Sequence, residues 1–197
     1  LCDRSGALLV LDEIQTGMGR TGSLWAYQQT PVRPDVITTA KALGGGVAIG
    51  ACITSPDTAG VLEPGDHGST FAAGPVAASA AMAVLGIVDT PETLRRVREL
   101  GDRLTRRLQQ LDGVAEVRGR GLMIGVGLQE GHDAAAINTA LLGKGLIVNA
   151  PRPDTLRLLP PFIISDEQLE SAVGKIAEAL REAGDTNLKE TTAGGTK

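Results

Sequence analysis

An uninterrupted apolar run near the start of the chain places the strongest constraint on its fold. Residues 7–11, ALLVL, have the length of a strand and show no polar alternation. Such a run predicts a strand that is buried on both faces of a parallel or mixed sheet. Two acids, Asp12 and Glu13, follow at once. Open α/β sheets bind ligands beyond the carboxyl ends of their strands, and adjacent strand residues face opposite ways, so only one of the two acids can face a site.

The glycines after the acids spell G-x-G-x-x-G over residues 17–22, the pattern of a dinucleotide-binding loop. In that motif the first glycine directly follows the strand, and an acid that binds the ribose comes roughly 20 residues later. Here DEIQT separates the strand from the first glycine, and the next acid, Asp35, comes too early. A loop beside a site is therefore the better interpretation of this run.

A lysine lies between two further predicted strands, residues 35–39 and 48–54. Lys41 comes just past the first of these and is surrounded by small and apolar residues, which reduce solvation and favour a neutral amine for imine chemistry. A lysine for the imine and a carboxylate for the pyridinium nitrogen are the pair that pyridoxal phosphate requires. Taken alone, each residue has a plainer alternative, a solvated lysine and a surface aspartate.

A long segment rich in alanine follows, residues 72–88. It is just short of the length that spans a membrane, and its residues are weakly hydrophobic. Pro75 suits a first helical turn, and small side chains allow another element to approach closely. We interpret the segment as a packed helix and expect no membrane partner.

Charged amphipathic sequence begins after Pro91, where apolar residues recur at helical spacing. Short strands are expected at residues 114–118, 122–128, 146–149 and 155–159, and helices at 133–142 and 166–183. Ser165 and Gln168 form a capping box at the start of the last helix. We therefore expect part of a large α/β domain at 1–89, a small α+β domain at 90–184 and a disordered tail at 185–197.

Composition excludes several function classes. A net charge of -4 offers no basic stripe for a phosphate backbone, and aromatic residues make up only 2% of the chain, so nucleic acid is not expected as a partner. Cys2 and Cys52 lie far apart without a C-x-x-C spacing, which favours a reducing, cytoplasmic location. No residue pattern indicates a metal site.

Five blocks in the order and spacing of this chain resemble the class III (ornithine-type) aminotransferases. They are LDEIQTGMGRTG, TTAKALGGGVAIGA, HGSTFAAGPVAASAA, RGRGLMIGVGL and TLRLLPPFIIS. The resemblance covers the chain to about its final helix and is strongest to members that act on N-acetylornithine. It implies the C-terminal half of a fold-type-I pyridoxal phosphate enzyme that transfers an amino group between N-acetylornithine and 2-oxoglutarate in arginine biosynthesis.

The resemblance assigns roles to three residues around the cofactor. Asp12 is implied to bond the pyridine nitrogen, and Gln15 to contact the phenolic oxygen. Lys41 is implied to form the imine and to move the proton between Cα and C4′. Glu13 is implied to face away from the ring.

Two further sites follow from the resemblance. Ser69 and Thr70 match a stretch whose threonine binds the cofactor phosphate of the neighbouring subunit, which implies a homodimer with a shared active site; Ser69 is also expected at the substrate. Arg157 is implied to receive a substrate carboxylate, and strand alternation separates it from Leu156 and Leu158. The alternatives are an ordinary turn for the hydroxyl pair and a solvated edge-strand arginine.

The chain also departs from the family. The family usually has F-G-G-N-P where residues 71–75 read FAAGP, so an asparagine is lost. The family's N-terminal half, with its phosphate loop, stacking aromatic residue, substrate arginine and gating glutamate, has no counterpart here, and we expect this fragment alone to be inactive. Another class III enzyme, acting on ornithine, 4-aminobutyrate or succinylornithine, and a non-catalytic dimerising module are the alternative functions.

Overall fold

The computed structural model describes every residue except His67, Phe71, Ala73 and residues 194–197, and it describes side chains as far as residue 184. Two residues of the family departure, Phe71 and Ala73, thus lie outside the described residues. The chain forms two compact units, Leu1–Arg95 and Arg96–Lys197.

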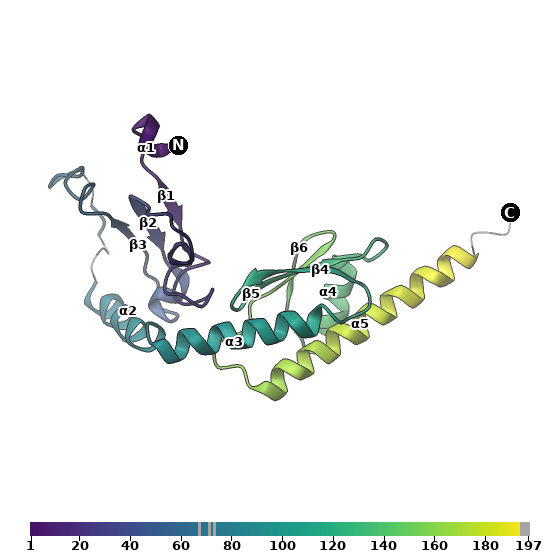
Figure 1. Cartoon of the computed structure of the whole chain (residues 1–197). Coiled ribbons are helices and arrows are strands. Elements are labelled where there is room, and N and C mark those ends of the chain that lie inside the picture. Colours follow the sequence, from purple (N-terminus) through teal and green to yellow (C-terminus); the bar gives the residue numbers. More distant parts are fainter. Residues whose placement is uncertain (67, 71, 73, 194–197) are drawn as a thin grey trace. The chain divides into compact units, whose positions relative to one another are not determined.

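The first unit is built on a mixed sheet of three strands in the order β1-β2-β3 (Figure 1). β1 (Val10–Asp12) and β2 (Val36–Thr39) are parallel, whereas β3 (Ala51–Thr54) runs antiparallel to β2. The mixed sheet expected from the sequence is confirmed. The register pairs Asp12 with Thr38 and Thr38 with Cys52, so these three residues lie in one row across the sheet.

β1 differs from its expectation in length and in burial. It begins at Val10 and includes Asp12, whereas a strand over residues 7–11 was expected. Val10 is 55% exposed, so the expected burial on both faces is wrong for this strand among the described residues. The reason is the lack of cover, because Val10 does not belong to the hydrophobic cluster of this unit in its described part, and β1 also has a strand on one side only.

Short helices complete the first unit. α1 (Cys2–Ser5) precedes β1, and the 3-10 helices η1 (Ala26–Gln29) and η2 (Lys41–Gly44) lie in the connections between strands. α2 (Pro75–Val88) has proline at its first position, as expected, and packs against η2. The small core of this unit contains Met18, Leu43 and Ala81.

The second unit has an antiparallel four-stranded sheet in the order β4-β5-β7-β6 (Figure 1). α3 (Pro91–Leu108) begins in the first unit and continues into the second. The other elements are β4 (Val114–Arg120), β5 (Met123–Leu128), α4 (Ala134–Gly143), β6 (Asn149–Arg152), β7 (Thr155–Leu158) and α5 (Asp166–Ala193). This arrangement confirms the expected α+β architecture.

The core of the second unit lies between one face of the sheet and the helices. Alternating apolar residues of β5 and β7, among them Ile124 and Leu156, pack with residues of α3, α4 and α5. α3 buries Val97, Leu100, Leu104 and Leu108 at helical spacing. At Gly101 a side chain would overlap the backbone of Gly121, so this close approach requires glycine.

Two elements of the second unit differ in extent from the sequence prediction. β6 begins at Asn149, whereas Leu146 and Val148 pack against the core outside the strand. α5 continues to Ala193, beyond the expected end at residue 183, because extending a formed helix needs no new nucleus. The capping box is confirmed: Ser165 N donates to Gln168 Oε1 (2.9 Å), and Gln168 N donates to Ser165 Oγ (3.2 Å).

Candidate functional site

Asp12 is the exposed carboxylate at the carboxyl end of β1. Its Oδ1 accepts a hydrogen bond from the Ile14 backbone N–H (2.9 Å) and another from the Thr38 hydroxyl on the neighbouring strand (3.3 Å). Among the described residues Oδ2 accepts none. The site therefore presents one oriented oxygen that is free to accept a hydrogen bond from a ligand.

Glu13 faces the interior instead and is only 3% exposed. Its Oε1 accepts from the Tyr27 N–H (2.9 Å), and its Oε2 accepts from the Thr16 hydroxyl. The Glu13 backbone N–H donates to the Thr38 carbonyl (2.9 Å), which continues the pairing of β1 with β2. The two adjacent acids thus separate as strand alternation predicts, with Asp12 exposed and Glu13 built into the loop that follows.

The glycine run after the acids forms turns, and the next helix begins only at Ala26. A side chain on Gly17 would come within 2.7 Å of both the Glu13 carbonyl and the Trp25 ring. Burial of Arg20 in the same run lowers the pKa of its guanidinium, because the charged form loses solvation. The described loop has no helix N-terminus at its third glycine, as a dinucleotide loop needs, and the interpretation as a loop beside the site is supported.

Lys41 is the first residue of η2, directly after β2, and its backbone is left-handed with φ 50°. Outside glycine this conformation costs about 1 kcal/mol or more, so the surrounding turn must hold it. β1 and β2 are parallel neighbours, so Asp12, the last residue of β1, and Lys41, two residues after β2, lie at the same end of the two strands. The expected loss of solvation is not found, because Lys41 is exposed in the described part of the chain.

The remaining predicted residues of the first unit lie in loops. Gln15 is exposed in the turn after β1. Ser69 and Thr70 are exposed ahead of α2, where the Ser69 carbonyl accepts from the Ala72 N–H (3.2 Å). The structure thus brings Asp12, Gln15 and Lys41 to connections at one end of β1 and β2, whereas the hydroxyl pair belongs to a separate turn.

Arg157 belongs to the second unit and lies in β7, where its partners in register are Gly125 and Asn149. Leu156 and Leu158 point into the core, so Arg157 faces the opposite side of the sheet. The predicted alternation is therefore confirmed. Arg157 is also not on an edge strand, because β7 lies between β5 and β6.

Arg118 is a second arginine on that face, and sequence reasoning missed it. It pairs in register with Gly125, its guanidinium forms an ion pair with Glu116, and its Nη2 lies 3.4 Å from the Thr155 hydroxyl on β7. The side chain crosses β5 at Gly125, where a Cβ would make only ordinary contact with Arg118 Cγ (3.6 Å), whereas a Cβ on Gly127 would come within 2.8 Å of Glu116 Cγ. The alternation of glycine with apolar residues in MIGVGL was the signal that could have been used. It indicates that one face of β5 carries no side chains of its own and can be covered by a side chain from a neighbouring strand.

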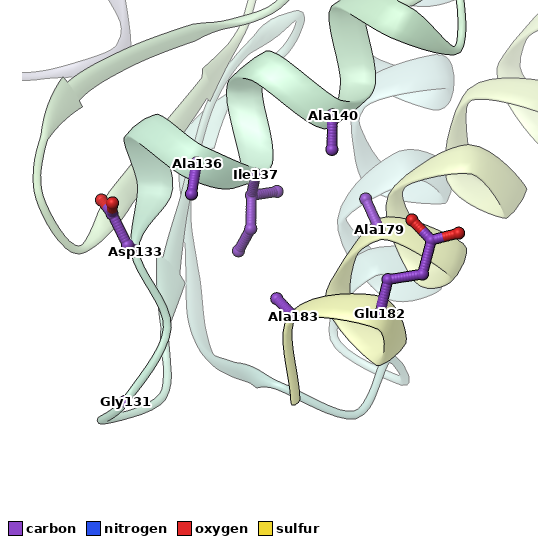
Figure 2. A pocket seen from close by; sticks show the side chains of 8 residues that line it. All are labelled: Gly131, Asp133, Ala136, Ile137, Ala140, Ala179, Glu182 and Ala183. Atoms are coloured by element: carbon purple, nitrogen blue, oxygen red, sulfur yellow. The ribbon is translucent and has the colours of Figure 1, made fainter. Parts of the chain in front are cut away.

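A hollow of about 280 Å³ lies between α4 and α5 of the second unit (Figure 2). Alanines and Ile137 point into it, and the carboxylates of Asp133 and Glu182 lie at its borders. Asp133 caps α4 by accepting from the Ala135 N–H (3.0 Å), and Glu182 pairs with Lys144 (2.9 Å). Both carboxylates therefore have structural partners, and the hollow brings no further reactive group to the candidate site.

No group of three or more histidine, cysteine, aspartate or glutamate side chains is arranged to hold a metal ion among the described residues. None of the described helices has both the length and the apolar character needed to cross a bilayer.

Comparison with known proteins identifies the fold around these residues. The family model described as aminotransferase class-III matches residues 1–180. Acetylornithine aminotransferase of Corynebacterium efficiens is 46% identical over 182 residues, which are 92% of this chain and 45% of the relative. The corresponding protein of Mycobacterium tuberculosis is 47% identical, over 91% of this chain and 45% of the relative. The chain thus spans about half the length of the curated relatives it matches.

Solved structures agree. N-acetylornithine aminotransferase of Stenotrophomonas maltophilia superposes with a TM-score of 0.80 at 38% identity, over 92% of this chain and 49% of that one. An ornithine aminotransferase of Toxoplasma gondii, whose crystals contain PLP at partial occupancy in the active site, gives a TM-score of 0.84 at 32% identity, over 94% and 45%. The resemblance and the fold class expected from the sequence are confirmed. The chain belongs to the class III aminotransferase family.

Proposed function

We propose that this chain contributes the lysine and the aspartate of a pyridoxal phosphate-dependent aminotransferase that acts on N-acetylornithine and 2-oxoglutarate in arginine biosynthesis. One observation carries the proposal: Asp12 is the last residue of β1, and Lys41 comes two residues after the end of the adjacent parallel strand β2. The names of the curated relatives support the choice of substrate. A cytoplasmic location and a division into a large-domain part at 1–89 and a small domain at 90–184 belong to the same proposal.

The described residues fit the ring end of the cofactor. Asp12 Oδ2 is a free acceptor among them and suits a protonated ring nitrogen, while the exposed Lys41 amine suits its carbonyl carbon. When bound, pyridoxal phosphate supplies an electron-accepting ring that stabilises negative charge at the substrate Cα. Asp12 would bind the ring nitrogen and keep it protonated, and Lys41 Nζ would be the group that carries the proton taken from the substrate Cα.

Other residues are proposed to bind and orient. Gln15 contacts the phenolic oxygen, and Ser69 and Thr70 bind the phosphate across a homodimer interface, with Ser69 also at the substrate. Arg157 receives a carboxylate of the amino-acid or 2-oxo-acid substrate, because a guanidinium can hold a carboxylate with two parallel hydrogen bonds. Its place on the polar face of β7 supports this role.

Activity is proposed for a protein in which the rest of the class III fold accompanies this chain. Apolar side chains of the first unit are exposed, including Val10 in β1, Ile53 in β3, and Val76 and Met82 in α2. Exposed apolar surface on this scale suits elements that pack against further parts of a fold. We therefore expect the 197-residue chain alone to bind the cofactor weakly and to be inactive.

A class III enzyme that acts on ornithine is the second candidate, because an ornithine aminotransferase superposes well on this chain. The acetylornithine enzyme is favoured by identity among the solved structures, which is 38% for the Stenotrophomonas enzyme against 32% for that ornithine enzyme. The two candidate enzymes differ in the amine donor that they prefer, and a comparison of N-acetylornithine with ornithine as donors distinguishes them.

The decisive experiment uses a full-length chimera, in which the remaining part of the Corynebacterium relative completes this chain. The chimera is incubated with pyridoxal phosphate and reduced with borohydride, and the modified lysine is identified by mass spectrometry. We expect labelling at Lys41, its loss in Lys41→Ala, and its retention in the control Lys175→Ala. Normal labelling of the Lys41→Ala variant would falsify the assignment.

Substrate choice is tested in the same chimera with 2-oxoglutarate as acceptor. We expect N-acetylornithine to be the preferred donor over ornithine and 4-aminobutyrate. Activity with 4-aminobutyrate and none with N-acetylornithine would contradict the proposed substrate. Cofactor binding without any transamination would favour the non-catalytic alternative.

A further inference from the structure

Thr38 is the residue of β2 that lies directly opposite Asp12 in the parallel register. It comes three positions before Lys41, so β2 connects the partner of the aspartate with the lysine. Thr38 is half-buried, and its side chain lies on the same face of the sheet as Asp12. From this position the Thr38 hydroxyl can reach one oxygen of the Asp12 carboxylate and leave the other oxygen open.

Two groups of Thr38 hold the residues at the end of β1. The Thr38 carbonyl accepts from the Glu13 N–H (2.9 Å), and this bond fixes the backbone next to Asp12. The Thr38 hydroxyl donates to Asp12 Oδ1 over 3.3 Å, which is longer than a typical hydrogen bond from a hydroxyl and indicates a weak one. The backbone hydrogen bond fixes the position of the main chain next to Asp12. The hydroxyl hydrogen bond instead affects the orientation of the Asp12 carboxylate.

Both recorded hydrogen bonds to the Asp12 carboxylate end on the same oxygen. Ile14 N and Thr38 Oγ1 donate to Oδ1, and among the described residues Oδ2 accepts none. A carboxylate held through one oxygen by two donors from different directions has its plane and its free oxygen defined. A carboxylate that must accept a hydrogen bond from a single nitrogen of a ligand needs such a fixed orientation.

We propose that Thr38 is a positioning residue, whose hydroxyl turns the Asp12 carboxylate so that Oδ2 faces the cofactor ring nitrogen. The proposal rests on the proposed function, because the ring nitrogen is the group that Asp12 serves there. Thr38 itself touches no substrate. Its effect is transmitted through one hydrogen bond, and we therefore expect a moderate effect.

The variants Thr38→Val and Thr38→Ser separate this role from strand structure. Valine keeps the size and the β-branched shape that suit a strand but lacks the hydroxyl, whereas serine keeps the hydroxyl and loses a methyl group. A merely structural role predicts that valine is tolerated at least as well as serine. A positioning role predicts that Thr38→Ser keeps the wild-type orientation of the Asp12 side chain and the wild-type cofactor affinity, whereas Thr38→Val loses both.

The first measurement needs no cofactor. Three-bond Hα–Hβ couplings of Asp12 in the 197-residue chain report whether its side chain occupies one rotamer. We expect one rotamer in the wild type and in Thr38→Ser, and averaged couplings in Thr38→Val, while the amide shifts of β2 show that the strand persists. Unchanged Asp12 couplings in Thr38→Val overturn the proposal. If that variant does not fold, Thr38→Ala is the second variant and the same outcomes apply.

The second measurement is cofactor affinity in the full-length chimera. Loss of one neutral donor to a charged acceptor corresponds to about five-fold weaker pyridoxal phosphate binding in Thr38→Val, with near wild-type affinity in Thr38→Ser. Equal affinities in the wild type and Thr38→Val overturn the proposal. If the couplings change as expected but the wild-type chimera binds no cofactor, Thr38 orients Asp12 and the proposed function is what fails.

Discussion

The two units of the chain bury their apolar residues to very different extents. The second unit encloses a continuous core between its sheet and its helices, whereas the buried hydrophobic cluster in the described part of the first unit comprises Met18, Leu43 and Ala81. Leu156 in the second unit is 0% exposed, but Ile53, in a strand of the same length in the first, is 44% exposed. The second unit is stabilised by its own packing, whereas the first holds its shape largely through hydrogen bonds around the candidate site.

Removal of core side chains tests this difference most strongly. Leu156→Ala deletes a fully buried side chain, and we expect it to destabilise the second unit by about 3 kcal/mol. The matched change Ile53→Ala in the first unit should cost less than about 1 kcal/mol, because the site is already solvated. Urea unfolding followed by circular dichroism and by the fluorescence of Trp25, the single tryptophan, separates the units. Equal losses for the two variants would contradict the comparison.

A glycine pair gives the second test. In Gly101→Ala the new methyl group meets the Gly121 backbone, and we expect a loss of about 2 kcal/mol. In Gly86→Ala, within α2 of the first unit, a methyl group meets nothing within 4 Å and should stabilise the helix by about 0.5 kcal/mol or more. Thermal melts of both variants show whether Tm falls in Gly101→Ala and rises in Gly86→Ala. A stabilising Gly101→Ala would show that α3 can move away from the turn.

The hydrogen-bonded character of the first unit is tested at Glu13. Glu13→Leu fills the space but leaves the Tyr27 N–H and the Thr16 hydroxyl without their acceptor, so we expect a loss of about 1–2 kcal/mol in the Trp25 transition. Glu13→Gln can still accept from Tyr27 and donate to Thr16 and should lose less. The exposed change Glu63→Gln is the control. A neutral Glu13→Leu would show that packing, not hydrogen bonding, holds this loop.

The smallest effect concerns an exposed ion pair of the second unit. The Arg103 guanidinium, 2.7 Å from Asp166, lowers the pKa of the Asp166 carboxyl below its usual 3.8. A depressed folded-state pKa stabilises the fold above the unfolded value, and this stabilisation is lost as pH falls through the folded-state pKa. Asp166→Asn should therefore lower Tm by about 1 °C or less at pH 7, since exposed pairs contribute little. The difference should shrink as pH falls below 3.8 and vanish once the carboxyl is protonated in the folded state as well; a difference that is the same at neutral and at strongly acidic pH would exclude the ion pair as its cause.

Local patterns in the sequence predicted most elements of the second unit. The helical spacing in α3, the alternation in β5 and β7, and the Ser165 capping box each depend on residues close together in the chain. Such patterns reflect which side of an element is buried, and they survive in any surroundings that supply a core. The same reasoning was wrong for the burial of β1. An apolar run indicates that a strand favours burial, but it does not show that another element packs on that strand.

By itself the sequence determined the family, the order of strands and helices, and the chemistry available at Asp12, Lys41 and Arg157. Only the tertiary structure decided that Glu13 accepts from Tyr27 and Thr16, that Thr38 donates to Asp12, and that Arg118 crosses β5 to Thr155. The physical reason is the range of the interactions. Periodicity is local, whereas Asp12 and Thr38 are 26 residues apart and meet only because the parallel register of β1 and β2 places them side by side.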